Sequence, residues 1–287
     1  NELDIVFQDV SDDKYLKLYK LDSILVDHGT NTLENSIKFS HEENDMFIGL
    51  NASAFETLKE NYNDKYEYIL PEITLDKNLF SSNKFGSLDL QSNFKAHNYD
   101  TNKSSNFLVN NFNWNFKDKK FSNGIKGRFL TNLKNINYES KNIENLKQDT
   151  TSELYGAFGY FSEIDLQKEE NGNRYSLKPK FLLRFSPGSM RKQTSGSRLD
   201  PTAAFSMDRL DRDNNFETGL SATVGFDYEI NENNKKFDFS VAQIINEKEN
   251  KDMASKTSLD EKISDLVGKS SYKINDNMSL NYNFSVD

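Results

Sequence analysis

Residues 216–230 alternate between apolar and polar side chains for fifteen consecutive positions. One series is Phe216, Thr218, Leu220, Ala222, Val224, Phe226, Tyr228 and Ile230, and the other is Glu217, Gly219, Ser221, Thr223, Gly225, Asp227 and Glu229. A period of two is typical of a β-strand with one dry face and one wet face. At about 3.3 Å per residue such a strand spans roughly 50 Å, which is long for a soluble protein. The small, polar face predicts a water-filled interior, and the apolar face must meet a core or lipid.

The composition of the 287-residue chain is polar, yet it is rich in aromatic residues. Only 35% of the residues are hydrophobic, and the mean hydropathy is −0.79. Disordered chains are similarly polar, but 22 Phe and 13 Tyr residues argue against disorder. A membrane β-barrel fits this composition because its strands are half polar by construction. A secreted soluble all-β protein fits nearly as well, so composition leaves both classes open.

Shorter alternating segments recur along the chain, and we predict about thirteen strands, with residues 258–266 as the one candidate helix. From residue 97 onward the connections alternate in length. The long ones are 98–106, 134–152, 186–215 and 247–257, and the short ones are 117–120, 170–173, 231–234 and 275–277. In an antiparallel meander, alternate connections lie at opposite ends of the sheet. Membrane barrels show this asymmetry, with short periplasmic turns and long extracellular loops.

These patterns predict an all-β fold, an antiparallel up-and-down transmembrane β-barrel. In that fold the series from Phe216 to Ile230 faces lipid, and the series from Glu217 to Glu229 faces the lumen. The strand then runs from the long loop at 186–215, on the outer surface, to a periplasmic turn at 231–234. Aromatic residues near strand ends either form an interfacial girdle or reflect the general preference of strands for aromatics; they are Phe107, Trp114, Phe116, Phe121, Tyr160, Phe161, Phe185, Phe216 and Tyr228.

The sequence lacks the local motifs of enzymes and of metal sites. It contains no glycine-rich phosphate loop, no Gly-x-Ser-x-Gly and no His-Glu-x-x-His. It has no cysteine, and His28, His41 and His97 share no metal-ligand spacing. The net charge of −9 argues against a nucleic-acid partner. We therefore predict a protein that is not an enzyme and has no cofactor, no bound metal and no nucleic-acid partner.

A row of cations marks the polar face of the segment before the long loop. Lys178, Lys180 and Arg184 share that face, and in a lumen they are candidates for contact with anionic or phosphate groups. The alternative is charge balance against acids of the neighbouring strand, such as Glu217 and Asp227, since opposite charges pair readily across strands.

The loop at 186–215 is unusual because it is long and has an apolar centre. It carries several arginines and aspartates around Ala203-Ala204-Phe205 and Met207. Long loops without structure of their own are uncommon and often functional. The apolar centre predicts that the loop packs on the barrel, over or into its lumen, and the alternative is a variable surface loop.

Several segments, in this order and spacing, resemble the barrel of the outer-membrane lipopolysaccharide-assembly family LptD, also called OstA or organic solvent tolerance. They are residues 12–16 (DDKYL), 68–73 (YILPEI), 85–88 (FGSL), 177–180 (LKPK), 198–201 (RLDP), 205–210 (FSMDRL), 217–219 (ETG), 225–228 (GFDY), 258–260 (SLD) and 264–268 (SDLVG). The resemblance covers most of the chain, and no single segment is specific by itself.

The resemblance implies transport of lipopolysaccharide (LPS) and its insertion into the outer leaflet of the outer membrane of a Gram-negative bacterium. It implies three kinds of partner: LPS itself, a plug lipoprotein in the lumen, and the periplasmic bridge proteins that deliver LPS. It also implies a lateral opening between the first and last strands. In this setting Lys178, Lys180, Arg184, Glu217 and Asp227 are lumen-facing candidates for contact with lipid A phosphates or the plug.

The chain departs from the family pattern in length, because the family barrel has roughly 26 strands and we predict about half that number. We therefore expect a partial barrel at residues 14–287, preceded at residues 1–13 by a linker from a missing periplasmic domain. If the first strand begins there, Tyr15, Lys17 and Tyr19 lie on one side of the gate strand. Two other functions stay open, a generic outer-membrane porin or substrate channel and a soluble or surface-anchored all-β binding protein.

Overall fold

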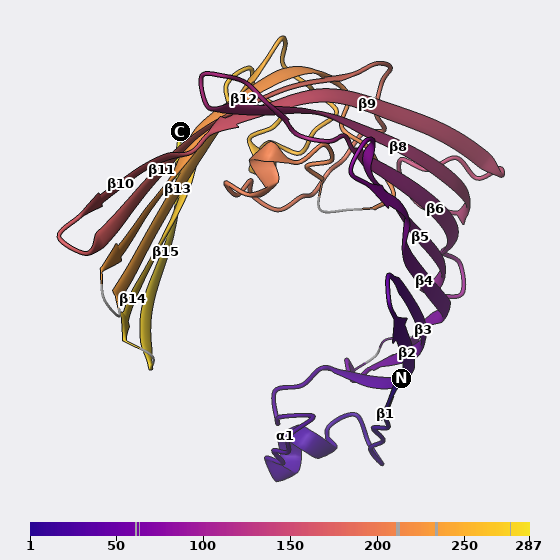
Figure 1. Cartoon of the computed structure of the whole chain (residues 1–287). Coiled ribbons are helices and arrows are strands. Elements are labelled where there is room, and N and C mark those ends of the chain that lie inside the picture. Colours follow the sequence, from indigo (N-terminus) through magenta and orange to yellow (C-terminus); the bar gives the residue numbers. More distant parts are fainter. Residues whose placement is uncertain (61, 63, 211–212, 233–234, 276) are drawn as a thin grey trace. The chain divides into compact units, whose positions relative to one another are not determined.

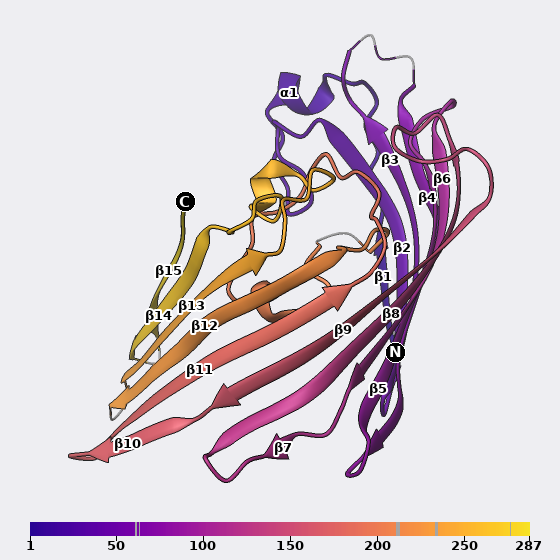
Figure 2. The same cartoon turned by 90° about the horizontal axis from the view of Figure 1, so that it is seen from above.

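The computed structural model describes residues 1–60, 62, 64–210, 213–232, 235–275 and 277–287. Within them, fifteen strands form one antiparallel sheet (Figures 1 and 2). The strands are β1 (Glu2–Val6), β2 (Thr32–Glu43), β3 (Met46–Thr57), β4 (Tyr66–Ser82), β5 (Gly86–Asn98), β6 (Ser104–Asn115), β7 (Lys119–Lys120), β8 (Ile125–Lys141), β9 (Thr151–Ile164), β10 (Leu166–Glu170), β11 (Asn173–Ser186), β12 (Gly219–Glu232), β13 (Lys235–Asn246), β14 (Leu266–Asn275) and β15 (Met278–Val286). The helical elements are α1 (Tyr15–Tyr19) and two 3₁₀ turns, η1 (Ala203–Phe205) and η2 (Ser255–Thr257).

The strands follow one another across the sheet in chain order, which confirms the predicted up-and-down topology. The path runs β1-β2-β3-β4-β5-β6-β8-β9-β11-β12-β13-β14-β15, with β7 paired to β8 and β10 paired to β11 beside it. This path contains thirteen strands, as the sequence predicts. The sheet is open, with β1 and β15 at the two ends of the path. No described helix is long and apolar enough to cross a membrane.

Strand β12 shows the alternation that the sequence predicts, but it is shorter than the pattern. Leu220 and Val224 are exposed on one face, whereas Ser221 and Thr223 are buried on the other. The strand begins at Gly219, whose φ of +124° suits glycine because it has no Cβ. Phe216 and Glu217 therefore belong to the preceding loop, and the predicted lipid-facing position of Phe216 is wrong.

The connections keep much of the predicted rhythm. The turns at 44–45, 83–85 and 171–172 are short, whereas residues 187–218 and 247–265 form long loops. The predicted loop at 134–152 shrinks to 142–150 because β8 extends to Lys141, and the one at 98–106 shrinks to 99–103. The predicted turn at 117–120 is part of a longer connection that contains β7. Residues 258–266 are not helical, and the turns expected at 231–234 and 275–277 lie partly outside the described residues.

The first 31 residues differ most from the prediction. Residues 2–6 form β1, which pairs with residues 36–40 of β2, so the stretch expected to be a linker contains a short strand. The segment at Tyr15–Tyr19 is a helix rather than the first strand. Five residues of alternating sequence are too few to distinguish the two structures. A periplasmic domain before the barrel stays a prediction.

The chain divides into two compact units, each with its own buried cluster. The first comprises Asn1–Leu79, Asp89–Asn111 and Asn135–Glu153, and the second Phe80–Leu88, Phe112–Lys134 and Leu154–Asp287. The first unit has a small core of Leu16, Leu33 and Leu58. A larger core in the second unit combines residues of the two long loops with strand residues; it contains Met190, Leu199, Ala204, Ala242, Ile244, Met253, Leu259 and Val267.

Candidate functional site

The cationic row on β11 faces acids of the neighbouring strand β12. The register pairs Lys178 with Asp227, and the ammonium group of Lys180 donates a hydrogen bond to the Asp227 carboxylate. Lys180 also lies over the ring of Phe205, 5.7 Å from its centroid. Lys178, Lys180 and Asp227 stay partly exposed, so the charge balance foreseen as the alternative is present at these positions without burying them.

Arg184, the third member of the row, is buried against the long loop. Its Nε donates to the backbone oxygen of Met207 at 2.7 Å, and its Nη2 donates to the backbone oxygen of Glu217 at 2.5 Å. Arg209, which sequence reasoning missed, binds the same glutamate through both carboxylate oxygens and donates to Ser221 Oγ at 2.9 Å. Planar guanidinium groups suit such two-point contacts. The arrangement ties the loop to β11 and β12.

A second ion pair fastens the same loop to β8. Lys134 Nζ donates to the Asp208 carboxylate and, at 3.3 Å, to the backbone oxygen of Asn215. The ring of Phe216 lies close to both cations, with its centroid 5.5 Å from Lys134 Nζ and 5.4 Å from the Arg184 guanidinium carbon. Phe216 is fully buried, and cations above an aromatic ring are attracted to its π-electrons. We call Lys134, Arg184, Asp208, Arg209 and Glu217 the ion cluster.

The loop carboxylates of the ion cluster have shifted pKa values in opposite directions. Burial alone would raise the pKa of Glu217, but the guanidinium groups of Arg209 and Arg184 hold it below its ordinary value. Burial raises the pKa of Asp208 despite the opposing effect of Lys134. The two arginines thus favour the charged form of Glu217, which interacts with both of them.

The two long loops pack together on the polar face of the sheet. Gln193 N donates to the backbone oxygen of Asp252 at 2.7 Å, which joins the loops directly. Thr223 Oγ1 donates to the backbone oxygen of Ala204 at 2.9 Å, and the Ala204 side chain is fully buried. The apolar centre of the loop at 187–218 therefore packs on the sheet, as its sequence predicts. Beneath it the polar face is dry, so the water-filled interior expected from the sequence does not extend to Ser221 and Thr223.

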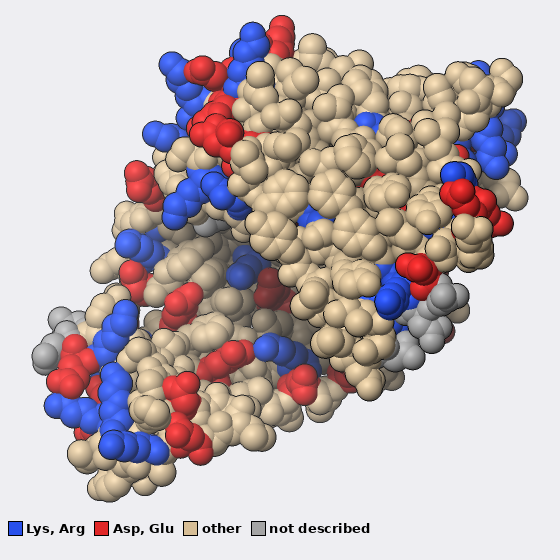
Figure 3. Space-filling view, turned by 90° about the vertical axis from the view of Figure 1, so that its left-hand side faces the viewer, with Lys and Arg blue, Asp and Glu red and all other residues tan. Residues whose placement is uncertain are grey.

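The opposite face of the same strands exposes large apolar side chains. In the second unit, residues of β9, β11, β12 and β13 expose 37–69% of their surface; they are Leu154, Phe158, Phe181, Leu183, Phe185, Leu220, Val224 and Ile245. Soluble monomers rarely expose so many large apolar residues on one face. The molecular surface in Figure 3 likewise shows a broad uncharged area bordered by groups of charged side chains. Such a face suits lipid.

Aromatic residues gather around the turns β4–β5 and β6–β8. Trp114 stacks on Phe116 at 4.3 Å between ring centroids, meets Phe80 edge-on and donates from Nε1 to the backbone oxygen of Phe85 at 3.0 Å. This group resembles an interfacial girdle, in which amphipathic rings sit at the membrane boundary. In contrast, Phe107 and Phe161 are buried, so they do not belong to such a girdle.

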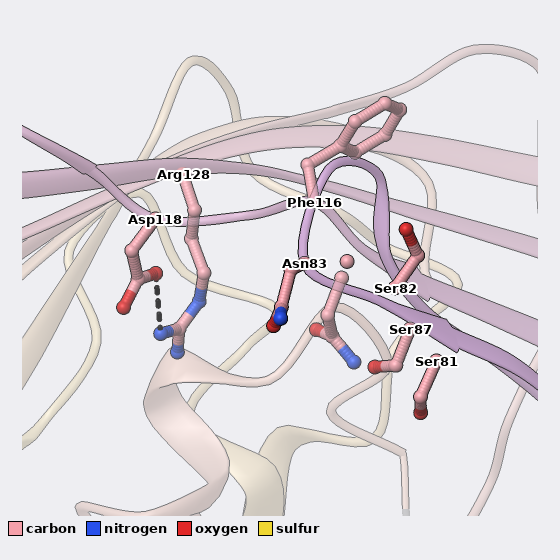
Figure 4. Close-up of a pocket in the computed structure, with 9 residues that line it drawn as sticks. Ser81, Ser82, Asn83, Ser87, Phe116, Asp118 and Arg128 are labelled. Carbon is pink, nitrogen blue, oxygen red and sulfur yellow. Dashed lines mark hydrogen bonds and ion pairs between the residues drawn. The ribbon is translucent and has the colours of Figure 1, made fainter.

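A cavity of about 660 Å³ lies beside these turns (Figure 4). Hydroxyl and amide side chains line it, together with one ion pair; the labelled polar residues are Ser81, Ser82, Asn83, Ser87, Asp118 and Arg128. Arg128 Nη1 lies 3.2 Å from the Asp118 carboxylate, so the pair balances its own charge. The cavity therefore suits neutral polar groups. In the described part of the chain, no His, Asp and Glu side chains cluster in the manner of metal ligands.

The predicted gate residues lie together, but not on a strand. Tyr15 and Tyr19 are on α1, with ring centroids 4.9 Å apart, and Lys17 Nζ donates to Asn31 Oδ1 at 2.8 Å. The strand assignment of these three residues is wrong. The edge of the sheet is β1, where Leu3 and Ile5 are exposed.

Residues 193–285 match the model of the LptD family, described as LPS transport system D. Over this region the chain is similar to the LptD family. The matched region begins inside the loop at 187–218 and continues through β12, β13 and β14 into β15. It contains three members of the ion cluster, Asp208, Arg209 and Glu217. The LptD family is a transport component of the outer membrane of Gram-negative bacteria. A search of curated proteins found no match to the chain.

Proposed function

We propose that this chain is a section of the barrel wall of an LPS translocon, and that it takes part in the insertion of LPS into the outer leaflet. The observation that carries the proposal is the LptD match over residues 193–285. The match falls on the loop and strands that combine a dry, ion-paired interior with an apolar exterior. Transport of this kind requires a wall and a path but no catalytic group, so we propose that the chain is not an enzyme.

The apolar exterior supports a location in the outer membrane. Exposed side chains such as Phe158, Leu183 and Val224 lie on the face opposite the ion cluster. In a membrane barrel this face contacts lipid, and the alternating positions face the lumen. The aromatic group around Trp114 then lies at one membrane boundary.

The partners follow from the family and from which polar groups are accessible. We propose that LPS, a plug lipoprotein in the lumen and periplasmic bridge proteins act with this chain. Arg184 and Glu217 are committed to internal contacts, so the proposed contacts with lipid A phosphates or the plug shift to Lys178, Lys180 and Asp227. We place the lateral opening at β1, the edge strand, in place of the helix that carries the predicted gate residues.

Depletion of the full-length protein in its host tests this function. LPS is expected to disappear from the cell surface and to return with the wild-type gene. A photocrosslinking residue at Ile5 is expected to capture LPS or the closing strand, whereas the same probe at exposed Glu169 of β10 serves as the control. Normal surface LPS after depletion, together with loss of solute uptake, would instead identify a porin or substrate channel.

A further inference from the structure

The connection between β1 and β2 carries apolar side chains that point away from the protein. We call residues 15–25 the apolar segment. In it Leu18 exposes 71% of its surface, Tyr19 61% and Ile24 102%, and Leu21 and Leu25 are also exposed. A single exposed leucine needs no explanation, but a run of five within eight residues does.

This exposure does not result from a loosely held loop. Leu16 packs in the core of the first unit with Leu33 and Leu58, which anchors α1. The end of the helix is closed by a hydrogen bond from Leu21 N to the backbone oxygen of Leu16 at 3.1 Å. Ser23 N donates to the backbone oxygen of Val26 at 2.7 Å, which folds the following turn. The backbone therefore holds the apolar side chains outward.

The residues of α1 separate around the helix into three directions. Leu16 points into the core, Tyr15, Leu18 and Tyr19 form the exposed side, and Lys14 and Lys17 flank it. Tyrosine and leucine beside lysine is the composition of segments that lie in a membrane interface, where rings sit at the boundary and lysines reach the headgroups.

Charge attraction does not dominate this segment. The connection also contains aspartates, among them Asp13, which pairs with Lys65 at 2.6 Å, and Asp22, which pairs with His28 at 2.9 Å. These acids offset the lysines, so apolar area is the main driving force available for binding. That favours the acyl layer of a membrane over a charged partner.

The exposed apolar surface also continues from the strand into the connection. Leu3, Ile5 and Phe7 expose 62, 64 and 77% of their surface on alternate positions of β1 and its end. If the apolar face of the sheet contacts lipid, as in the proposed function on which this inference rests, the chain leaves β1 already inside the acyl region. We propose that the apolar segment, residues 15–25, inserts into the acyl layer of the membrane leaflet at the long-loop end of the barrel.

Depth-dependent fluorescence quenching tests the insertion. Trp114, the one tryptophan of the chain, is replaced by phenylalanine in the full-length protein, and single tryptophans are introduced as Leu18→Trp and, separately, Ile24→Trp. The variants are reconstituted in vesicles of phosphatidylcholine with or without bromine on the acyl chains. Val224→Trp on the apolar face of β12 is the lipid-exposed control, and Glu169→Trp in β10 is the water-exposed control.

If the apolar segment is inserted, brominated lipid quenches the tryptophan fluorescence at positions 18 and 24 about as strongly as at position 224. Aqueous iodide then quenches only the tryptophan at position 169. Quenching at position 224 together with iodide quenching at 18 and 24 overturns the insertion and leaves the proposed function standing. Protection of 18 and 24 from both quenchers also overturns it, since a protein then covers the segment. Absence of lipid quenching at position 224 overturns the membrane location itself, and the insertion with it.

Discussion

Neutralising Glu217 is the most direct way to test the role of the ion cluster. The Glu217→Gln substitution keeps the size of the side chain and removes the negative charge shared by Arg184 and Arg209. Both side chains are almost fully buried, at 1% and 0% exposed. Removing one partner of a buried ion pair typically costs about 3–5 kcal/mol, because the remaining charge stays buried. The glutamine oxygen retains one acceptor, so we expect about 3 kcal/mol, which corresponds to roughly a hundredfold change in an equilibrium.

Limited trypsin cleavage in the loop at 187–218 measures this loss. Lys192 and Arg198 are cleavage sites in the loop, and the Arg198 side chain is 65% exposed. Proteases require several residues in an extended conformation, so cleavage follows local opening of the loop when opening is fast. Loop cleavage is therefore expected to accelerate by about a hundredfold in the variant, with little change in the cleavage of other regions.

Glu229→Gln is the matched control for this experiment. Glu229 lies on β12, after the loop, and pairs with Lys236 at 3.4 Å, but the two side chains are 37 and 44% exposed. Exposed pairs contribute about 0–1 kcal/mol, so its loop cleavage is expected to stay close to that of the wild type. Equal cleavage rates for the two variants would refute the view that the ion cluster fastens the loop.

Three further predictions follow from the same elements. The pKa of Glu217 lies below its ordinary value of 4.5, so the stability that its charge gives to the closed loop is complete above pH 4.5 and is lost as the pH falls through the lower pKa of the folded state. Cleavage of the loop by an acid-active protease should therefore rise over this acidic range in the wild type and stay unchanged in Glu217→Gln. At Gly225 an added Cβ would lie 2.2 Å from a backbone oxygen of β13, so Gly225→Ala should cost about 1–3 kcal/mol in urea unfolding, whereas Gly156→Ala, with its nearest atom at 3.9 Å, should be tolerated. Val224→Arg should cost about 2–4 kcal/mol when unfolding is measured in lipid vesicles, and Ser240→Arg on the polar face of β13 should cost less; equal costs would contradict the assignment of the faces.

The regular part of the fold was predictable because its signal is local. Alternation along β12 fixes which side chains share a face, and the turn residues fix where strands reverse. The number of strands on the main path and their order follow from these signals. The same reasoning failed at α1, where Tyr15, Lys17 and Tyr19 alternate with leucines. Helix and strand place these side chains differently, but the choice depends on packing of Leu16 on the distant Leu33 and Leu58.

The ion cluster shows a different limit of sequence reasoning. Lys134 and Asp208 are 74 residues apart, and no local pattern marks either of them as a partner of the other. Phe216 fitted the apolar series of β12 in phase, yet it belongs to the loop, and its ring contacts the cations of Lys134 on β8 and Arg184 on β11. A period-two pattern does not show where a strand begins, because residues before Gly219, the first residue of β12, can continue the pattern by chance. The sequence therefore identified the charged residues on the polar face, but it did not show that Arg184 and Glu217 among them are buried.

The distance along the chain between Lys134 and Asp208 also has a consequence for folding kinetics. Adjacent strands of the meander meet through turns that are mostly short, so their contacts form at low entropic cost. The ion cluster requires β8, β11 and β12 to be in place before the loop can bind to them. We therefore expect its contacts to be absent from the folding transition state, so that substitutions there accelerate unfolding and leave the folding rate nearly unchanged. On this view the ion cluster slows the opening of the loop at 187–218 but does not change the rate at which the sheet folds.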